Sequence, residues 1–284
     1  MDDVRQAQTN AAEPSEVAAA LSFIVRDGTR PGTYMYDPPG GTPRQIGRFS
    51  AERVIIRNGR PIRDRLSVDA QGFGLVDHAT KVADFYSEAQ VAEVYYPEME
   101  RLLLGLTGAE RVLVFDHTRR TGSVTDAAKR AFRDPVRRVH ADYTPKSGPQ
   151  RVRDLLPPDE ARLRLERRFA IINVWRPVTG PLVEAPLALC DWQSVGPDDL
   201  VETDQIYRDR IGETYNVAYS SGQRWYYFPH MRTDEAALIK SYDSRQDVAR
   251  FTPHGAFDDP TMPANPLPRE SIEIRALVFY PPGT

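Results

Sequence analysis

The chain has 284 residues, a formal net charge of −3 and 27% charged residues. It therefore lacks the basic excess that binds nucleic acid or an anionic membrane surface. No run approaches the length of uninterrupted apolar sequence that a membrane-spanning helix needs. We expect a small-molecule substrate, and no nucleic-acid or membrane partner. Composition leaves monomer and homodimer as alternatives.

The N-terminal segment is polar and acidic before any apolar run, and it lacks the charged-then-apolar pattern of a secretion signal. We expect a flexible leader over residues 1–20, followed by a single domain over residues 21–284. The one cysteine, Cys190, excludes an internal disulfide. This usage is typical of a reducing compartment, so the expected location is the cytoplasm.

The first half of the chain mixes short strands with helices. Apolar runs predict strands at residues 21–25, 54–56 and 72–76, with turn residues between them. Ser87 followed by Gln90 is a capping-box pattern, which predicts a helix start. Pro97 then kinks that helix or starts a second one. A buried stripe at helical spacing follows, formed by Met99, Leu102, Leu103 and Leu106.

The second half changes character after a β-rich run at residues 111–115 and two Arg-rich helical pieces separated by Pro157-Pro158. From there the apolar runs are short and separated by turn residues. They lie at residues 169–175, 187–190, 215–219, 225–228, 236–242 and 272–280. This pattern is typical of an antiparallel sandwich or barrel, so the predicted fold is mainly β with flanking helices.

His140 and Asp142 lie two residues apart on a predicted strand over residues 139–144. Side chains alternate between the two faces of a strand, so this pair projects from one face. Together with a distant histidine they would complete the 2-His-1-carboxylate triad of non-haem Fe(II) oxygenases. That triad leaves positions open for a 2-oxo acid and for O₂. A polar surface strand explains so short a motif equally well.

Two histidines are candidates for the third ligand, namely His230 and His254, which lie 90 and 114 residues after His140. The region after His254 favours it, because a final predicted strand follows that carries Arg269, Ser271 and Arg275. The planar fork of an arginine suits a carboxylate, such as the distal one of 2-oxoglutarate. The alternative is a solvent-facing ladder of charges on that strand.

Several blocks together resemble a known family of Fe(II)/2-oxoglutarate-dependent oxygenases. The family includes the cephalosporin 7α-methoxylation protein, fungal gibberellin desaturase-like hydroxylase/desaturases and endoperoxide-forming oxygenases. The resemblance spans roughly residues 50–282. The blocks are VFDHTRR at 114–120, HADYT at 140–144, NVWRP at 173–177, PLALCD at 186–191, RWYYFP at 224–229, KSYDS at 240–244, TPHGAFDDP at 252–260 and RESIEIR at 269–275.

The resemblance implies a double-stranded β-helix, which is a jelly-roll or cupin-like barrel, and it assigns roles to individual residues. It implies that the metal ligands are His140, Asp142 and His254. Candidate 2-oxoglutarate residues are Arg269, Ser271, Arg275, Asn173 and Arg176. Candidate substrate-pocket residues are Tyr143, Trp175 and Phe257. The implied cofactor is Fe(II), with 2-oxoglutarate and O₂ as co-substrates.

The implied reaction oxidises an unactivated C–H bond of a small natural-product or amino-acid-like substrate and releases succinate and CO₂. Hydroxylation, desaturation and cyclisation are all open outcomes. One rival is a metal-dependent dioxygenase or hydrolase on the same barrel that uses no 2-oxoglutarate, and another is a non-catalytic binding barrel. The discriminating feature is whether Arg269 or Arg275 faces the metal pair.

Overall fold

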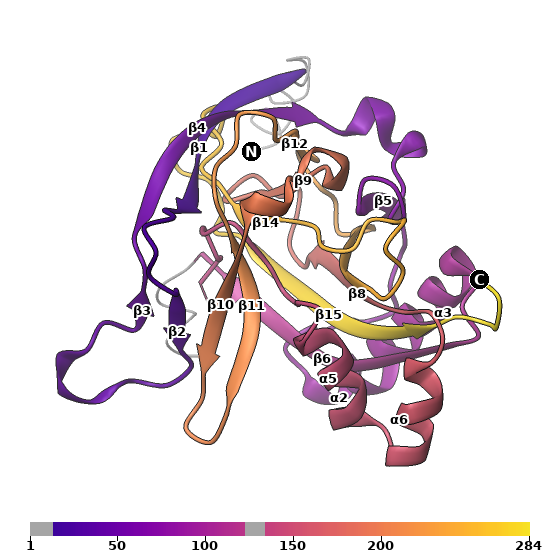
Figure 1. Ribbon diagram of the computed structural model, residues 1–284. Helices are drawn as coiled ribbons and strands as arrows, with labels where there is room; N and C mark the ends of the chain where they lie inside the picture. The colour runs from indigo at the N-terminus through magenta and orange to yellow at the C-terminus, as the bar shows by residue number, and fades with distance from the viewer. Residues whose placement is uncertain (1–13, 123–133) are drawn as a thin grey trace.

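The computed structural model describes residues 14–122 and 134–284, and it is built from two β-sheets with helices on one side (Figure 1). The larger sheet has the order β1 (Glu16–Ile24), β4 (Phe49–Asn58), β12 (Trp225–Tyr227), β9 (Leu187–Cys190), β14 (His254–Ala256), β7 (His140–Ala141), β11 (Ile211–Val217), β10 (Leu200–Ile206), β2 (Gly32–Tyr34) and β3 (Gln45–Ile46). The smaller sheet has the order β5 (Phe73–Asp77), β13 (Glu235–Asp243), β8 (Phe169–Pro177), β15 (Glu270–Phe279) and β6 (Arg111–Thr121).

The helical segments are short. They are α2 (Glu88–Gln90), a π-helical turn (Val91–Tyr95), α3 (Tyr96–Thr107), α5 (Ser147–Leu155) and α6 (Pro158–Leu165), with 3-10 turns at Pro39–Gly41, Arg60–Arg65, Trp192–Ser194 and Pro197–Asp199. In Figure 1 the helices α2, α3, α5 and α6 gather near the smaller sheet, while the long β1–β4 pair curves around the opposite side. Among the described residues, no helix has the length and hydrophobicity that a bilayer crossing requires.

The smaller sheet is covered on both faces, which explains why every residue of β8 is buried. Ile172 and Val174 face outward into a cluster that includes Met99 of α3. Trp175 faces inward and packs with Leu189 of β9 in the larger sheet. Side chains of alternating parity thus fill two cores, and the inner one separates the two sheets.

The inner face of this sandwich brings distant parts of the sequence together. β14 pairs with β7, and His254 lies directly opposite His140 in the register. In the smaller sheet β15 pairs with β8, and Arg275 lies directly opposite Asn173. The two sheets therefore present polar side chains toward one another at the same place.

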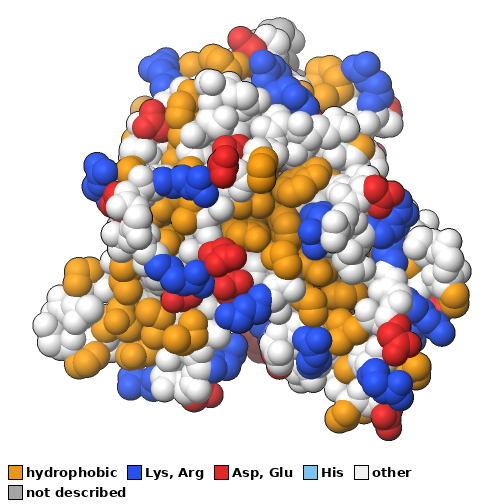
Figure 2. Space-filling model, in the orientation of Figure 1, with side chains coloured by type: hydrophobic (Ala, Val, Ile, Leu, Met, Phe, Trp, Pro, Cys, Tyr) orange, Lys and Arg blue, Asp and Glu red, His pale blue; other side chains and the backbone are white. Residues whose placement is uncertain are grey.

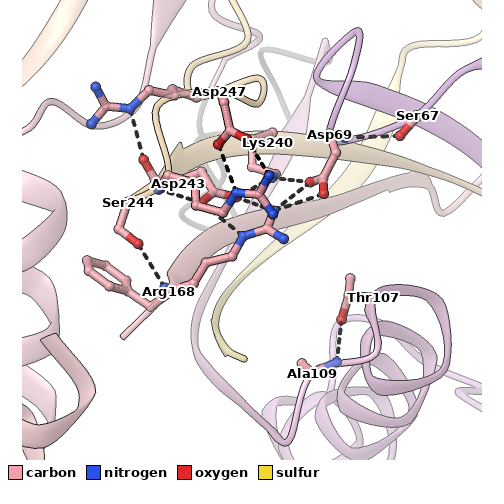
Figure 3. Close-up of polar contacts among 12 residues, drawn as sticks. Ser67, Asp69, Thr107, Ala109, Arg168, Lys240, Asp243, Ser244 and Asp247 are labelled. Carbon is pink, nitrogen blue, oxygen red and sulfur yellow. Dashed lines mark hydrogen bonds and ion pairs between the residues drawn. The ribbon is translucent and has the colours of Figure 1, made fainter. Parts of the chain in front are cut away.

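A buried polar network ties three segments together near the start of β8 (Figure 3). The Lys240 ammonium lies 2.6 Å from Asp243 and 2.7 Å from Asp69, and both Lys240 and Asp243 are fully buried. The Arg168 guanidinium lies 2.9 Å from each of the same two carboxylates. Because buried charges are costly unless paired, these contacts join β13 and β8 to the segment before β5.

The architecture confirms the expected mainly β jelly-roll with flanking helices, but the first strand starts earlier than expected. β1 begins at Glu16, inside the segment assigned to a leader, because Val17 and Ala19 point into the core while the strand pairs with β4. Residues 1–13 of that expected leader lie outside the described residues.

The predicted helix start is confirmed, since the Ser87 side chain accepts a hydrogen bond from the Gln90 backbone N–H. Pro97 lies in the first turn of α3, where its missing N–H costs nothing. Other strands differ from expectation. The strand carrying His140 ends at Ala141, and β10, with its sequence LVETDQI, offered no apolar run to predict it.

Candidate metal centre

Three side chains that are far apart in the sequence form one cluster between the sheets. The cluster consists of His140, Asp142 and His254, whose candidate ligand atoms all lie within 4.8 Å of one another. The two imidazole rings are 4.4 Å apart between centroids. Asp142 Oδ1 lies 3.5 Å from His140 Nε2. Two nitrogens and one carboxylate oxygen make up the donor set of a non-haem iron centre.

Hydrogen bonds to the backbone orient both imidazoles. His140 Nδ1 lies 2.8 Å from the carbonyl oxygen of Arg138, and His254 Nδ1 lies 2.9 Å from that of Thr252. A carbonyl oxygen only accepts, so each Nδ1 carries the proton and each Nε2 keeps a free lone pair. Metal-ligating histidines are typically held in this way by their second ring nitrogen. The residues present therefore fit a bound metal ion.

Electrostatics keep the cluster in the protonation state that a metal needs. Burial first, and the neighbouring His254 second, lower the pKa of His140 to about 3. Burial by itself raises the pKa of Asp142, but Arg275 and the two histidines outweigh it and hold that pKa below its ordinary value. At neutral pH the metal would meet a neutral imidazole and an ionised carboxylate, with no proton to displace.

Of the two candidate third ligands, His254 lies beside the metal pair and His230 does not. His230 is exposed at a turn between β12 and β13, where it has a positive φ of 49°. Its backbone carbonyl accepts a hydrogen bond from the Arg60 guanidinium. His254 is buried and starts β14, next to the strand of His140.

Arg269 is a buried cation beside the cluster. Its side chain is 3% exposed and lines a small cavity together with His140 and His254. Nε donates to Ser271 Oγ at 3.1 Å and Nη1 donates to the Ala185 carbonyl at 2.7 Å. No carboxylate in the described ranges forms an ion pair with it. Burial first, and nearby Arg120 second, lower the pKa of Arg269 to about 9.

Arg275 differs from Arg269 because acidic groups surround it. Its Nη2 lies 2.7 Å from Glu273 Oε1, and its Nη1 lies 3.0 Å from Asp116 Oδ1. Its Nε lies 3.6 Å from Asp142 Oδ2. Both arginines therefore face the cluster, but the guanidinium of Arg275 is already engaged.

Asn173 and Arg176 lie on opposite faces of β8. The Asn173 side-chain N–H groups reach Asp142 Oδ2 at 2.6 Å and Glu273 Oε1 at 3.2 Å. Arg176 points to the helical side, where its guanidinium lies 2.8 Å from His78 Nδ1 and 5.1 Å from the centre of the Tyr95 ring. The expectation that Arg176 contacts the co-substrate is therefore corrected. Strand parity separates it from Asn173.

The three expected pocket residues lie in different places. Tyr143 lines a cavity of about 660 Å³ that reaches Asp142, and Trp175 lines the small cavity beside Arg269. Phe257 packs edge-to-face on Tyr227, with ring centroids 5.4 Å apart, in the core of the larger sheet. The structure therefore does not bring Phe257 to the metal cluster, because its ring fills the core between neighbouring strands.

Sequence reasoning missed residues that line both large cavities. A second cavity, of about 800 Å³, also reaches Asp142 and Arg275. Met35 and Gln205 line both cavities. They come from or adjoin β2 and β10, which were not expected as strands. One signal in the sequence could have indicated these residues. Thr203 and Gln205 lie two apart on a polar strand, so their side chains project from one face, which is the face that lines the second cavity.

Comparisons with known proteins agree with this geometry. A family model described as an oxidoreductase/YMDC permease-like domain matches residues 21–279. The Fe(II)/2-oxoglutarate-dependent dioxygenase nvfI of Aspergillus novofumigatus is 32% identical over 256 residues, which cover 87% of this chain and 90% of the relative. The hydroxylase/desaturase efuI of Hormonema carpetanum is 36% identical, with 93% of this chain and 92% of the relative covered.

A solved structure is also similar. That of the iron and α-ketoglutarate-dependent endoperoxidase NvfI superposes with a TM-score of 0.85 at 28% identity, covering 94% of this chain and 98% of that chain. The cluster of two histidines and an aspartate agrees with the iron dependence in the descriptions of nvfI and NvfI. The chain therefore belongs to the family of Fe(II)/2-oxoglutarate-dependent dioxygenases, and it is an enzyme that uses Fe(II), 2-oxoglutarate and O₂.

Proposed function

We propose that His140, Asp142 and His254 hold the iron and that Arg269, with Ser271, holds the distal carboxylate of 2-oxoglutarate. One observation carries the second assignment. Arg269 is a buried cation beside both histidines, and its guanidinium forms no ion pair with a carboxylate among the described residues. A buried charge without a counter-ion is costly, so a ligand carboxylate would relieve that cost.

The choice between the two arginines follows from their partners. The carboxylates of Glu273 and Asp116 bind Arg275, and that of Asp142 lies against it. The guanidinium of Arg269 donates its hydrogen bonds to two neutral acceptors, a hydroxyl and a carbonyl. A charge-assisted pair is stronger than a neutral hydrogen bond. Arg269 would therefore gain more than Arg275 from binding the carboxylate of a ligand. The rival without 2-oxoglutarate gains no support, since the dioxygenase nvfI and the endoperoxidase NvfI are both described as dependent on it.

When bound, Fe(II) and 2-oxoglutarate supply with O₂ the oxidising power for an unactivated C–H bond, and 2-oxoglutarate leaves as succinate and CO₂. The protein supplies orientation. The backbone carbonyls of Arg138 and Thr252 aim the two imidazoles. The strands around the cluster leave the side chains of His140 and Asp142 only slightly exposed. The guanidinium of Arg269, over the Trp175 ring at 4.9 Å, offers a fixed anchor.

The organic substrate would occupy the cavity of about 660 Å³, whose volume suits a small molecule. Tyr143 and Gln205 line its wall, and Tyr207 and Ile211 lie on the β10–β11 side. Hydrophobic side chains gather at the lower left of Figure 2, where Figure 1 places this hairpin and the β2–β3 segment. We infer a small natural-product or amino-acid-like substrate, with hydroxylation, desaturation or cyclisation as the outcome.

The same proposal covers organisation and location. The oxygenase domain is a single unit over residues 21–284, to which β1 adds residues 16–20. The enzyme works in the cytoplasm, which the single buried cysteine, Cys190, supports because it forms no disulfide.

The test is an anaerobic titration of the protein with Fe(II) and 2-oxoglutarate. Chelation of the co-substrate should produce a weak visible charge-transfer band in the wild type and in His230→Ala. The band should be absent in His254→Ala, which loses a ligand. A band lost in His230→Ala but kept in His254→Ala would overturn the ligand assignment. Its absence from protein shown to contain iron would refute the co-substrate site.

A further inference from the structure

The two carboxylate oxygens of Asp142 have different surroundings. Oδ1 lies on the side of the metal cluster, 3.5 Å from His140 Nε2. Oδ2 accepts a hydrogen bond of 2.6 Å from Asn173 Nδ2 and lies 3.6 Å from Arg275 Nε. One oxygen thus faces the position of a metal ion, and the other faces donors from the opposite sheet.

Those donors are themselves fixed. Arg275 and Asn173 are direct cross-strand neighbours on β15 and β8. Glu273 Oε1 accepts from both of them, at 2.7 Å from Arg275 Nη2 and 3.2 Å from Asn173 Nδ2. On the far side, Asp116 holds Arg275 Nη1 at 3.0 Å. We call Asn173, Glu273 and Arg275 the carboxylate clamp.

The orientation of the Asn173 amide favours the contacts of its N–H₂ group over those of its carbonyl oxygen. Its N–H₂ group points to two carboxylates, which accept only. Its Oδ1 is buried and has no hydrogen-bond partner among the described residues. An unpaired buried carbonyl is unfavourable, so the contacts made by the N–H₂ group outweigh that cost.

We propose that the carboxylate clamp reserves Oδ2 of Asp142, so that this residue binds the metal through Oδ1 alone. The inference rests on the proposed metal ligands. A carboxylate can occupy one or two metal positions, and a second occupied position would compete with the co-substrates for the open face. Asn173 and Arg275 are thus positioning residues. Their task is to keep the coordination face open.

This role explains why two arginines lie on one strand face. The guanidinium of Arg269 forms no ion pair with a described carboxylate and suits a ligand carboxylate, whereas Arg275 is surrounded by acids and suits a permanent structural contact. Its strong ion pairs keep its fork in place whether or not a co-substrate is bound. Such support of a metal ligand by surrounding residues is commonly worth 10- to 100-fold in metal affinity.

The test titrates metal-free protein with Co(II), whose visible absorption reports the number and arrangement of its ligands. Asn173→Ala and Arg275→Lys both preserve net charge, so altered attraction for the cation does not complicate the result. We expect each to change the Co(II) spectrum, because Oδ2 becomes free to bind, and to weaken Co(II) affinity about 10- to 100-fold. Arg269→Lys is the matched control and should keep the wild-type Co(II) spectrum.

A purely structural role would lower the thermal midpoint and leave the spectrum of the folded protein unchanged. The proposal is overturned if both clamp variants keep the wild-type Co(II) spectrum. Should Arg275→Lys fail to fold, Asn173→Ala decides alone, since it removes one uncharged group. If Asp142→Ala itself binds Co(II) like the wild type, the assignment of Asp142 as a metal ligand is wrong. That result is distinct from failure of the clamp.

Discussion

Replacing Arg269 with Gln should remove the preference of the enzyme for a co-substrate with a distal carboxylate. Nε and Nη1 of Arg269 donate to Ser271 and Ala185, and Nη2 has no hydrogen-bond partner among the described residues. A carboxylate placed there gains a charge-assisted contact, for which about 1.5–3 kcal/mol is typical. Since about 1.4 kcal/mol corresponds to tenfold, the Kd for 2-oxoglutarate should rise roughly 10- to 150-fold.

The assay compares 2-oxoglutarate with 2-oxobutyrate, which has the same keto-acid end and no distal carboxylate. Both are titrated into the Fe(II) protein without O₂, with the charge-transfer band as the signal. The wild type should prefer 2-oxoglutarate by about the factor derived above, whereas Arg269→Gln should bind the two compounds almost equally. An undiminished preference in the variant would refute the anchor. Unchanged Co(II) affinity in the variant shows that the metal site is intact.

Two further predictions concern stability. Asp243→Asn should lower the free energy of unfolding by about 3–5 kcal/mol, because Lys240 and Arg168 lose a buried carboxylate. Chemical denaturation should show less than about 1 kcal/mol for the exposed control Asp247→Asn, and equal effects would contradict the burial argument. Acidification should destabilise the metal-free protein. The pKa of His140 is about 3 when folded and near 6.5 when unfolded, so the unfolded state binds more protons between these values. Stability is thus lost as the pH falls from about 6.5 toward 3. Thermal midpoints measured across this pH range in the presence of a chelator test the prediction, and His140→Asn should make them depend less on pH. Equal midpoints for the wild type at both ends of the pH range would contradict it.

The parts of the fold that the sequence predicted are those where packing is strong and regular. β8, β13 and β15 are long apolar runs, because both faces of the smaller sheet are covered. Alternation along β15 and the residue just before it places Arg275 and Arg269 on one face, as expected. Which of them is free to bind a ligand was beyond prediction. Two of the three acids around Arg275, Asp116 on β6 and Asp142 after β7, are far away in the sequence.

Short strands were the hardest to predict. β7 has two residues and β14 has three, yet they carry His140 and His254. Neither has enough residues for a periodic signal, so neighbouring strands set their position. His254 was chosen by its sequence context and by resemblance, and the structure brings it beside the pair. The cavity residues on β10 were missed for a related reason, since that strand is polar along its length.

Arg176 shows how a buried strand can mislead. An arginine in an apolar run indicates a buried polar partner, but it does not say on which face. Both faces of β8 are buried, so hydrophobicity does not distinguish the side of Asn173 from the side of Arg176. Their positions do distinguish the two sides, because residues 173 and 176 are an odd number of positions apart and so lie on opposite faces of the strand. Each buried polar group then needs a partner: Arg176 meets His78 among the helices, and Asn173 meets Asp142 inside. The guanidinium of Arg269 forms no ion pair with a described carboxylate, which is why we propose that a ligand supplies one.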